Sequence, residues 1–287
     1  MLRGGLLHAT GQGATGSRAP VEPGFSRAAD PSQLKSFMNP LTLIPARMAA
    51  SRLPGKPLAL IAGEPMIVQV WRRAVACGIG PVAVAAGDAE IVAAVRAAGG
   101  VAVLTDPDLP SGSDRSLAAL RELDPSGAHD VVINLQGDMP FVSADILTAC
   151  ADVLARESAC DIATVVAAEA SPADRTNPDV VKAVLALPPG ASYGRALYFT
   201  RSTLFGEAPV WRHVGVYGYR RDALERFCAA PPSQLETRER LEQLRALELG
   251  LSIWAGVAAQ APLSVDTPDD LAAARAFAAV NFTKATA

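Results

Sequence analysis

The sequence is poor in aromatic residues, has no long apolar run and carries no excess of positive charge. Only 5% of its 287 residues are aromatic, and the formal net charge is −3. A broad basic face for nucleic acid is therefore not expected, because such binding depends on many Lys and Arg contacts to phosphates. No run approaches the roughly 20 apolar residues of a membrane span. Neither nucleic acid nor a membrane is an expected partner.

Cysteine is scarce and shows no pairing pattern. The four cysteines form no C-x-x-C motif, and each lies in an apolar stretch: Cys77, Cys150, Cys160 and Cys228. Such cysteines are expected to be buried free thiols, which suits a reducing cytoplasm. The first ten residues contain only a two-leucine apolar patch, too short for the hydrophobic region of a secretion signal. The expected location is therefore cytoplasmic.

Half of the residues are hydrophobic, which favours helices packed on a buried sheet. Residues 1–37 are rich in Gly, Ser, Pro and Ala without helical or alternating periodicity, and this predicts a disordered extension. Residues 38–287 are expected to form a single domain.

Two patterns divide that domain. Over residues 38–160, short apolar runs alternate with amphipathic helices, which predicts an α/β fold with a mainly parallel sheet. Residues 161–257 contain successive strand-like runs, including 213–220, which indicate an antiparallel or mixed lobe. Helices are expected at 238–250 and within 258–287.

Ligands of such sheets bind beyond the carboxyl ends of the strands. The first loop there, "IPARMAASRLPGKPL" at 44–58, brings Arg47, Arg52 and Lys56 to the end of a strand. It suits a polyphosphate, although a solvated basic loop has the same composition. It is not a Walker motif, because Ala50 replaces a glycine and Pro57 follows the lysine.

Three further loops carry polar groups. "DLPSGSDR" at 108–115 suits a polar ligand or an ordinary turn, with Ser113 or Asp114 capping the next helix. "INLQGDMP" at 133–140 is expected to place Asp138 at a strand end, and "LSVDTPDDL" at 263–271 to do the same for Asp266. Thr267 or Asp269 would cap the last helix, so capping does not account for Asp266. Two such carboxylates suit Mg²⁺, although turn chemistry is the alternative for Asp138.

Eight stretches, taken in order, resemble the signature sequences of the 3-deoxy-manno-octulosonate (Kdo) cytidylyltransferase family. The likeness runs from about residue 39 to about residue 280. The stretches are "IPARMAASRLPGKPL…GEPMI", "SGSDR", "LQGDMP", "NPDVVK", "YFTRS", "RHVGVYGYR", "LEQLRALELG" and "VDTPDDL".

The resemblance implies a Rossmann-like nucleotidyltransferase fold with a small strand-rich lobe for the sugar and for dimerisation. The implied reaction converts CTP and Kdo into CMP-Kdo and pyrophosphate with Mg²⁺, for lipopolysaccharide biosynthesis, in a homodimer. It assigns catalytic roles to Lys56, Arg47, Asp138 and Asp266, the two aspartates being the metal ligands. It assigns substrate binding to Arg52, Ser113, Arg115, Gln136, Arg201, His213, Tyr217, Glu242 and Gln243.

Taken without the resemblance, the second-half residues have ordinary explanations. Alternation places His213, Tyr217 and Tyr219 on one face of a strand, and a structural histidine is the simpler reading. Glu242 lies in an arginine-rich segment typical of a solvated helix face, so only the resemblance raises these residues above background.

Three departures from the family pattern leave alternatives open. Met139 stands where the family usually has glutamate, the stretch from Arg201 to His213 is shorter, and the 37-residue extension has no counterpart. The alternatives are a cytidylyltransferase for another sugar acid, such as 8-amino-Kdo or a nonulosonate, and an inactive nucleotide-binding homologue.

Overall fold

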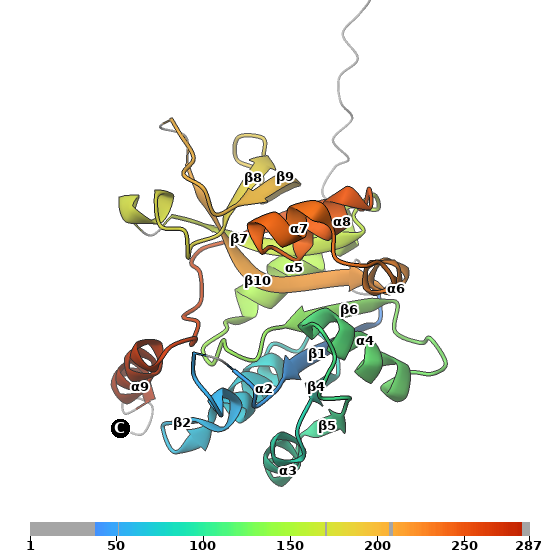
Figure 1. Cartoon of the computed structure of the whole chain (residues 1–287), viewed down its shortest axis with the longest axis vertical. Helices are drawn as coiled ribbons and strands as arrows, with labels where there is room; N and C mark the ends of the chain where they lie inside the picture. The colour runs from blue at the N-terminus through green and yellow to red at the C-terminus, as the bar shows by residue number, and fades with distance from the viewer. Residues whose placement is uncertain (1–37, 51, 170, 207–208, 283–287) are drawn as a thin grey trace, which may run out of the picture.

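A computed structural model describes residues 38–50, 52–169, 171–206 and 209–282 (Figure 1). The predicted extension at 1–37 lies outside these residues. Nine strands form one sheet in the order β5-β4-β1-β6-β10-β7-β11-β9-β8. The sheet continues from the first half of the chain into the second.

Four neighbouring strands of the first half run parallel: β5 (Val101–Leu104), β4 (Val82–Ala86), β1 (Pro40–Ala46) and β6 (Val131–Leu135). Three helices connect them, as predicted: α2 (Met66–Ala76), α3 (Ala89–Ala97) and α4 (Gly112–Leu123); α5 (Ala144–Arg156) follows β6 and leads to the second half. Parallel pairing requires such crossovers, and it brings the loops that follow these strands to one edge of the sheet.

The second half supplies β7 (Ile162–Ala168), β8 (Lys182–Ala186), β9 (Tyr193–Thr200), β10 (Trp211–Arg220) and β11 (Ile253–Ala258). β10 is antiparallel to both β6 and β7, and β9 is antiparallel to both β8 and β11. β8 also pairs with the start of β10. The strands β10, β7, β11, β9 and β8 therefore close a circuit, which is the predicted strand-rich lobe.

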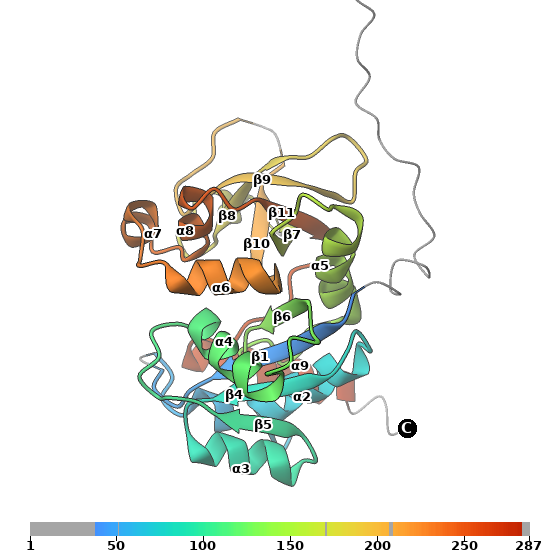
Figure 2. The ribbon, with the colours of Figure 1, turned by 90° about the vertical axis from the view of Figure 1, so that its right-hand side faces the viewer.

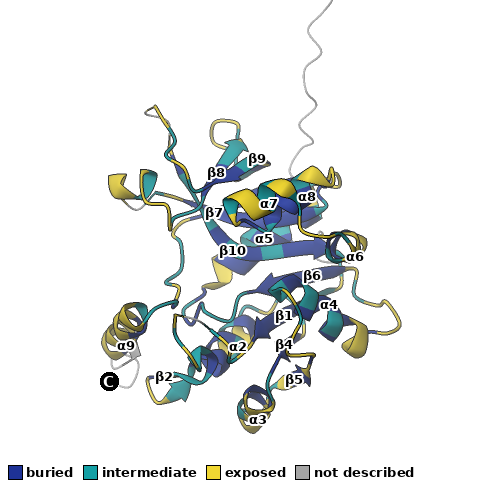
Figure 3. Ribbon diagram, viewed as in Figure 1, coloured by how far each residue is buried: buried dark blue, intermediate teal, exposed yellow. Residues whose placement is uncertain are grey.

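Both faces of the sheet are buried, because apolar residues alternate between two cores (Figure 3). In β1, Ile44 and Ala46 face the core shared with α2, α3 and α5. Leu41 and Leu43 face the other core, shared with α4, α6 (Arg221–Ala229) and α8 (Gln243–Glu248). The result is a three-layer α/β/α arrangement (Figure 2).

The last helix, α9 (Pro268–Phe282), returns to the first half of the chain. It lies beside the hairpin of β2 (Leu60–Ile61) and β3 (Glu64–Pro65) (Figure 1). A third core joins them, with Ile61 and Met66 packing against residues of α9 and its approach. This packing fixes the segment that carries Asp266.

Several local predictions are wrong. The helix expected at 238–250 is two short helices, α7 (Gln234–Glu239) and α8, because Arg240 adopts a left-handed conformation with φ of 56°. The helix α6 and the single-turn helix η2 (Pro172–Arg175) were not predicted. Asp266 does not follow a strand, because β11 ends at Ala258 and a coil leads on to α9.

Capping also differs from prediction at the start of α4. Ser111, not Ser113 or Asp114, caps α4, with its hydroxyl accepting from the Asp114 N–H. Asp88 precedes α3 without capping it; its carboxylate instead accepts from the Met48 N–H at 2.7 Å, which ties it to the first loop.

The four cysteines are free thiols, as predicted, although Cys77 and Cys228 are only partly buried. Across the described part of the chain, no helix has both the length and the apolar character needed to cross a bilayer.

Candidate active site

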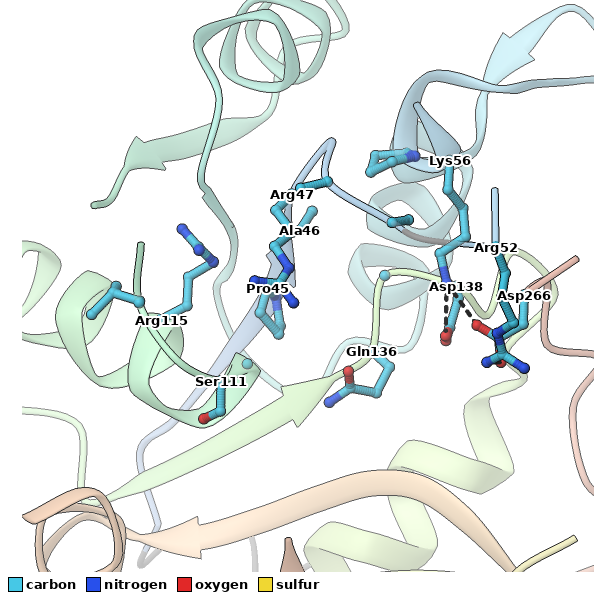
Figure 4. A pocket seen from close by; sticks show the side chains of 16 residues that line it. Pro45, Ala46, Arg47, Arg52, Lys56, Ser111, Arg115, Gln136, Asp138 and Asp266 are labelled. Atoms are coloured by element: carbon cyan, nitrogen blue, oxygen red, sulfur yellow. Dashed lines mark hydrogen bonds and ion pairs between the residues drawn. The ribbon is translucent and has the colours of Figure 1, made fainter. Parts of the chain in front are cut away.

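A cleft of about 330 Å³ opens at the carboxyl edge of the parallel strands. Seven of the predicted site residues line it: Arg47, Arg52, Lys56, Arg115, Gln136, Asp138 and Asp266. They come from the segments that follow β1 and β6, from the first turn of α4 and from the coil before α9 (Figure 4). The topology therefore gathers four distant segments at the edge where the sequence predicted a site.

Backbone geometry fixes the first loop. Gly55 has φ of 71°, a left-handed conformation that glycine adopts without strain, and it precedes a single-turn helix, η1 (Lys56–Leu58). The Asp88 carboxylate holds the opposite end of the loop through the Met48 N–H. Lys56 is thereby presented to the cleft from a constrained backbone.

The ammonium of Lys56 lies between the two predicted metal ligands. Its Nζ is 3.3 Å from Oδ2 of Asp138 and 3.0 Å from Oδ1 of Asp266 (Figure 4). Arg52 reaches the other oxygen of Asp266 at 3.2 Å. The structure thus brings one lysine, one arginine and two carboxylates into direct contact.

Asp138 is the most constrained member of this group. Burial raises its pKa, repulsion from Asp266 raises it further, and Lys56 lowers it. Its Oδ1 is buried without a hydrogen-bond partner among the described residues. A buried, unpaired carboxylate oxygen is costly, and a cation ligated there would satisfy it.

The donor set suits a hard divalent cation such as Mg²⁺. The described residues contain no group of three or more His, Cys, Asp or Glu side chains that could hold a metal ion. A cation held by Asp138 and Asp266 would take its remaining ligands from water and substrate phosphates, as Mg²⁺ commonly does.

Helix α4 begins at the cleft, where its cap Ser111 and first residue Gly112 form part of the wall. A helix N-terminus carries partial positive charge and unpaired N–H groups, which favour an anion. Arg115 is buried nearby and donates to the Thr105 hydroxyl and to the carbonyls of Asp106 and Pro107. It braces the loop after β5 as well as lining the cleft.

Two of the predicted sugar residues, His213 and Tyr217, lie apart from this cleft on β10. The ring of His213 is 5.4 Å from that of Tyr217, which is 5.9 Å from that of Tyr219. The predicted common face is thus confirmed, although β10 bulges between Val214 and Tyr217. The Ser113 hydroxyl lies 3.5 Å from that of Tyr219 and 3.3 Å from the Glu242 carboxylate. Ser113 therefore connects this row to the start of α4.

His213 has a defined tautomer. The Thr164 hydroxyl donates its only proton to the Val216 carbonyl at 2.8 Å, so it accepts from Nε2–H of His213 at 2.9 Å. Burial lowers the pKa of His213 to about 4, so the ring is neutral at pH 7. Its Nδ1 is consequently an acceptor.

Glu242, Gln243 and Arg201 occupy different settings. Burial raises the pKa of Glu242, which borders a second hollow formed with α7 and α8. Gln243 is buried, and its Nε2 has no hydrogen-bond partner among the described residues. The Arg201 guanidinium donates to the Pro178 carbonyl.

Lys182, at the end of the "NPDVVK" stretch, has a site-related position that sequence reasoning missed. It is fully buried, and its ammonium donates to the carbonyls of Asn177 and Arg201 at 2.6 and 2.9 Å. Asp270 was also missed: its carboxylate accepts from the N–H groups of Asp266 and Thr267 and from the Thr267 hydroxyl. Thr267 caps α9 in return, as predicted.

Met139 does not face the cleft. Its side chain is 5% exposed and belongs to the core shared with α2 and α5. The departure at this position therefore places an apolar side chain in the core beneath the site.

The three-layer fold and its charged cleft define a nucleotidyltransferase, and solved structures agree. CMP:2-keto-3-deoxy-manno-octonic acid synthetase complexed with CTP matches with a TM-score of 0.76 and 37% identity, over 84% of this chain and 99% of that one. A 4-diphosphocytidyl-2C-methyl-D-erythritol synthase from Anaerococcus prevotii shares the fold, with a TM-score of 0.57 and 11% identity over 83% of this chain and 98% of that one.

Sequence comparison narrows this class. The cytidylyltransferase family model matches residues 41–253. The 3-deoxy-manno-octulosonate cytidylyltransferase of Parvibaculum lavamentivorans is 55% identical over 88% of this chain and 97% of its own length. That of Methylobacterium nodulans is 57% identical over 83% and 96%, respectively. The chain belongs to the 3-deoxy-manno-octulosonate cytidylyltransferase family.

Proposed function

We propose that the protein transfers CMP from CTP to the anomeric hydroxyl of Kdo, releasing pyrophosphate in a Mg²⁺-dependent step of lipopolysaccharide biosynthesis. One observation carries the proposal. A lysine and two carboxylates from three distant segments meet at the end of a nucleotidyltransferase sheet, beside three arginines and a helix N-terminus. Membership of the family identifies CTP as the nucleotide and Kdo as the sugar acid in this proposal.

The chain's own residues contribute mainly positioning and charge. The hydroxyl must attack the α-phosphorus in line with the departing pyrophosphate, so orientation and neutralisation govern the rate. Arg47, Arg52 and Lys56 would bind the triphosphate, and Gln136 would help hold the nucleotide. Asp138 and Asp266 would hold Mg²⁺, which when bound neutralises phosphate charge and favours the ionised hydroxyl.

The strand-rich lobe would bind the sugar acid. Neutral His213 offers Nδ1 as an acceptor for a sugar hydroxyl, beside Tyr217. Gln243 offers an unpaired amide donor and Glu242 a carboxylate, while Arg201 supplies a positive charge for the acid group. Ser113, in the first turn of α4, connects the two groups of residues, because its hydroxyl lies 3.3 Å from the Glu242 carboxylate.

The test is pyrophosphate release by the purified protein with CTP, Mg²⁺ and Kdo. Parallel reactions replace CTP with UTP, replace Kdo with 8-amino-Kdo or a nonulosonate, or omit the metal. Release only in the complete Kdo mixture is expected. Release with another acid but not Kdo would reassign the substrate, and CTP binding without any release would identify an inactive homologue.

A homodimer in the cytoplasm completes the proposal. Phe205 is 94% exposed and Leu197 is 53% exposed, both in the strand-rich lobe, so this lobe presents apolar surface for a second copy. The free cysteines suit a reducing compartment. Sedimentation equilibrium is expected to give twice the chain mass, and Phe205→Asp is expected to weaken the dimer.

A further inference from the structure

Lys56 occupies the place of a cation between Asp138 and Asp266. The two carboxylates lie 82 and 210 residues further along the chain, and the ammonium contacts one oxygen of each. The Lys56 side chain is only 16% exposed, whereas that of Arg52, on the outer oxygen of Asp266, is 62% exposed. The lysine is thus the inner counterion of the pair.

A metal held by both carboxylates would lie against the ammonium, because Lys56 contacts one oxygen of each and Arg52 contacts the other oxygen of Asp266, which leaves only Oδ1 of Asp138 without a partner among the described residues. Mg²⁺ binds oxygen at about 2.0–2.1 Å, well inside the contacts that the ammonium makes here. A divalent cation and an ammonium bound between the same two carboxylates would also repel each other strongly. The lysine must withdraw from at least one carboxylate before both can ligate a metal.

The lysine can withdraw while its backbone stays in place. Its four-carbon stem is flexible, and its ammonium is a mobile point charge. The loop beneath it is fixed by Gly55 and by the bond from Met48 to Asp88. The cleft offers the ammonium one other destination, the nucleotide phosphates that would lie against Arg47 and the start of α4.

The geometry points to an ordered exchange of cations, which rests on the proposed function. In the free protein Lys56 holds the two carboxylates together and keeps metal affinity low. The triphosphate draws the ammonium away, so the metal enters with the nucleotide or after it. Lys56 therefore couples nucleotide binding to metal binding, in addition to neutralising phosphate charge.

Mn²⁺ titration followed by electron paramagnetic resonance tests this without any turnover. The proteins are wild type, Lys56→Met and Arg47→Met, each with and without CTP. Arg47 is the matched control: it lies in the same loop and lines the same cleft but makes no ion pair with a described carboxylate. Asp138→Asn shows which bound Mn²⁺ belongs to the site, and Lys56→Gln replaces Lys56→Met if the latter does not fold.

Without nucleotide, Lys56→Met is expected to bind Mn²⁺ at least about tenfold more tightly than wild type, a gain of about 1.4 kcal/mol. Arg47→Met is expected to change that affinity by less than about threefold, because it removes charge without freeing a carboxylate. CTP is expected to tighten Mn²⁺ binding to wild type and to have much less effect on Lys56→Met.

Two results would overturn the exchange. Mn²⁺ binding to nucleotide-free Lys56→Met that is unchanged or weaker would show that the lysine does not block the metal. Equal tightening in Lys56→Met and Arg47→Met would show a general effect of charge. The nucleotide-free comparison stands even if no sugar acid supports pyrophosphate release, so failure of the proposed function and failure of the exchange are distinguishable.

Discussion

Replacing Asp138 with Asn is expected to lower activity without lowering the stability of the fold. The side chain keeps its shape, while the site loses one of the two charges that hold Lys56 and, when bound, the metal. Because burial and Asp266 raise the Asp138 pKa, the folded state disfavours the charged carboxylate. Asp138→Asn is therefore expected to leave the midpoint of thermal unfolding unchanged or higher, while activity falls.

The contact distance to Lys56 sets the scale for a charge interaction at Asp138, whether the counterion is Lys56 in the free protein or the metal in the nucleotide complex. At the 3.3 Å between Lys56 Nζ and Asp138 Oδ2, two unit charges interact by roughly 5 kcal/mol at an effective dielectric constant of about 20. Solvent reduces this, because the Asp138 side chain is 20% exposed. A net loss of about 3 to 4 kcal/mol in transition-state stabilisation lowers kcat/KM by about 10² to 10³.

The assay is continuous pyrophosphate release at saturating Mg²⁺, together with thermal unfolding in the same buffer. Asp269→Asn is the control, since Asp269 is an exposed carboxylate three positions from Asp266; it is expected to keep wild-type turnover. Unchanged kcat/KM in Asp138→Asn would refute the role of this carboxylate. A large fall in the unfolding temperature would make it a structural residue instead.

Four other outcomes are expected. Lys182→Met should raise KM for the sugar acid and leave KM for CTP unchanged, because Lys182 fixes the backbone of Arg201; equal changes in both constants would contradict this. Arg245→Met should lower the unfolding free energy by about 3–5 kcal/mol in urea titrations, since it leaves Glu236 partly buried without its 2.6 Å partner; a loss below about 1 kcal/mol would contradict it. The pKa of His213 is about 6.5 in the unfolded chain and about 4 in the folded protein, so the unfolded chain takes up the proton first and stability falls as the pH is lowered from about 6.5 to about 4. His213→Gln should flatten the pH dependence of urea midpoints in that window. Gly218→Ala should destabilise by about 1–3 kcal/mol in the same titrations, because the added Cβ would lie 2.8 Å from Leu154; an unchanged midpoint would show that the core can yield.

Most of the parallel half could be predicted because its signals are local. The strand β1 shows buried apolar residues on both faces, and each crossover helix shows its own amphipathic period. The residues that line the cleft could be predicted for a related reason. Loops that follow parallel strands must meet at one edge, so Arg47 and Asp138 could be placed together before their distance was known.

The remaining features could not be predicted, because they depend on interactions between segments that are distant in the sequence. The residues around Arg240 give no sequence signal for the left-handed conformation that ends α7. This conformation accompanies the packing of α7 and α8 against the sheet. Asp88 has the sequence features of a helix cap, yet its carboxylate bonds to Met48, 40 residues earlier. A lysine in a strand is usually expected to be exposed, but Lys182 is buried and its ammonium bonds to the Asn177 carbonyl in the preceding loop.

The position of Asp266 has a consequence for how the protein is made. Its partner Lys56 is 210 residues earlier, and Asp266 becomes fixed when α9 packs against the β2–β3 hairpin. Domains form from the N-terminus as the ribosome delivers the chain. A nascent chain that has already assembled its parallel sheet still lacks one of the two site carboxylates. The site is complete only once the segment with Asp266 and α9 has been made and packed, so a nascent chain that ends before it lacks one of the two carboxylates.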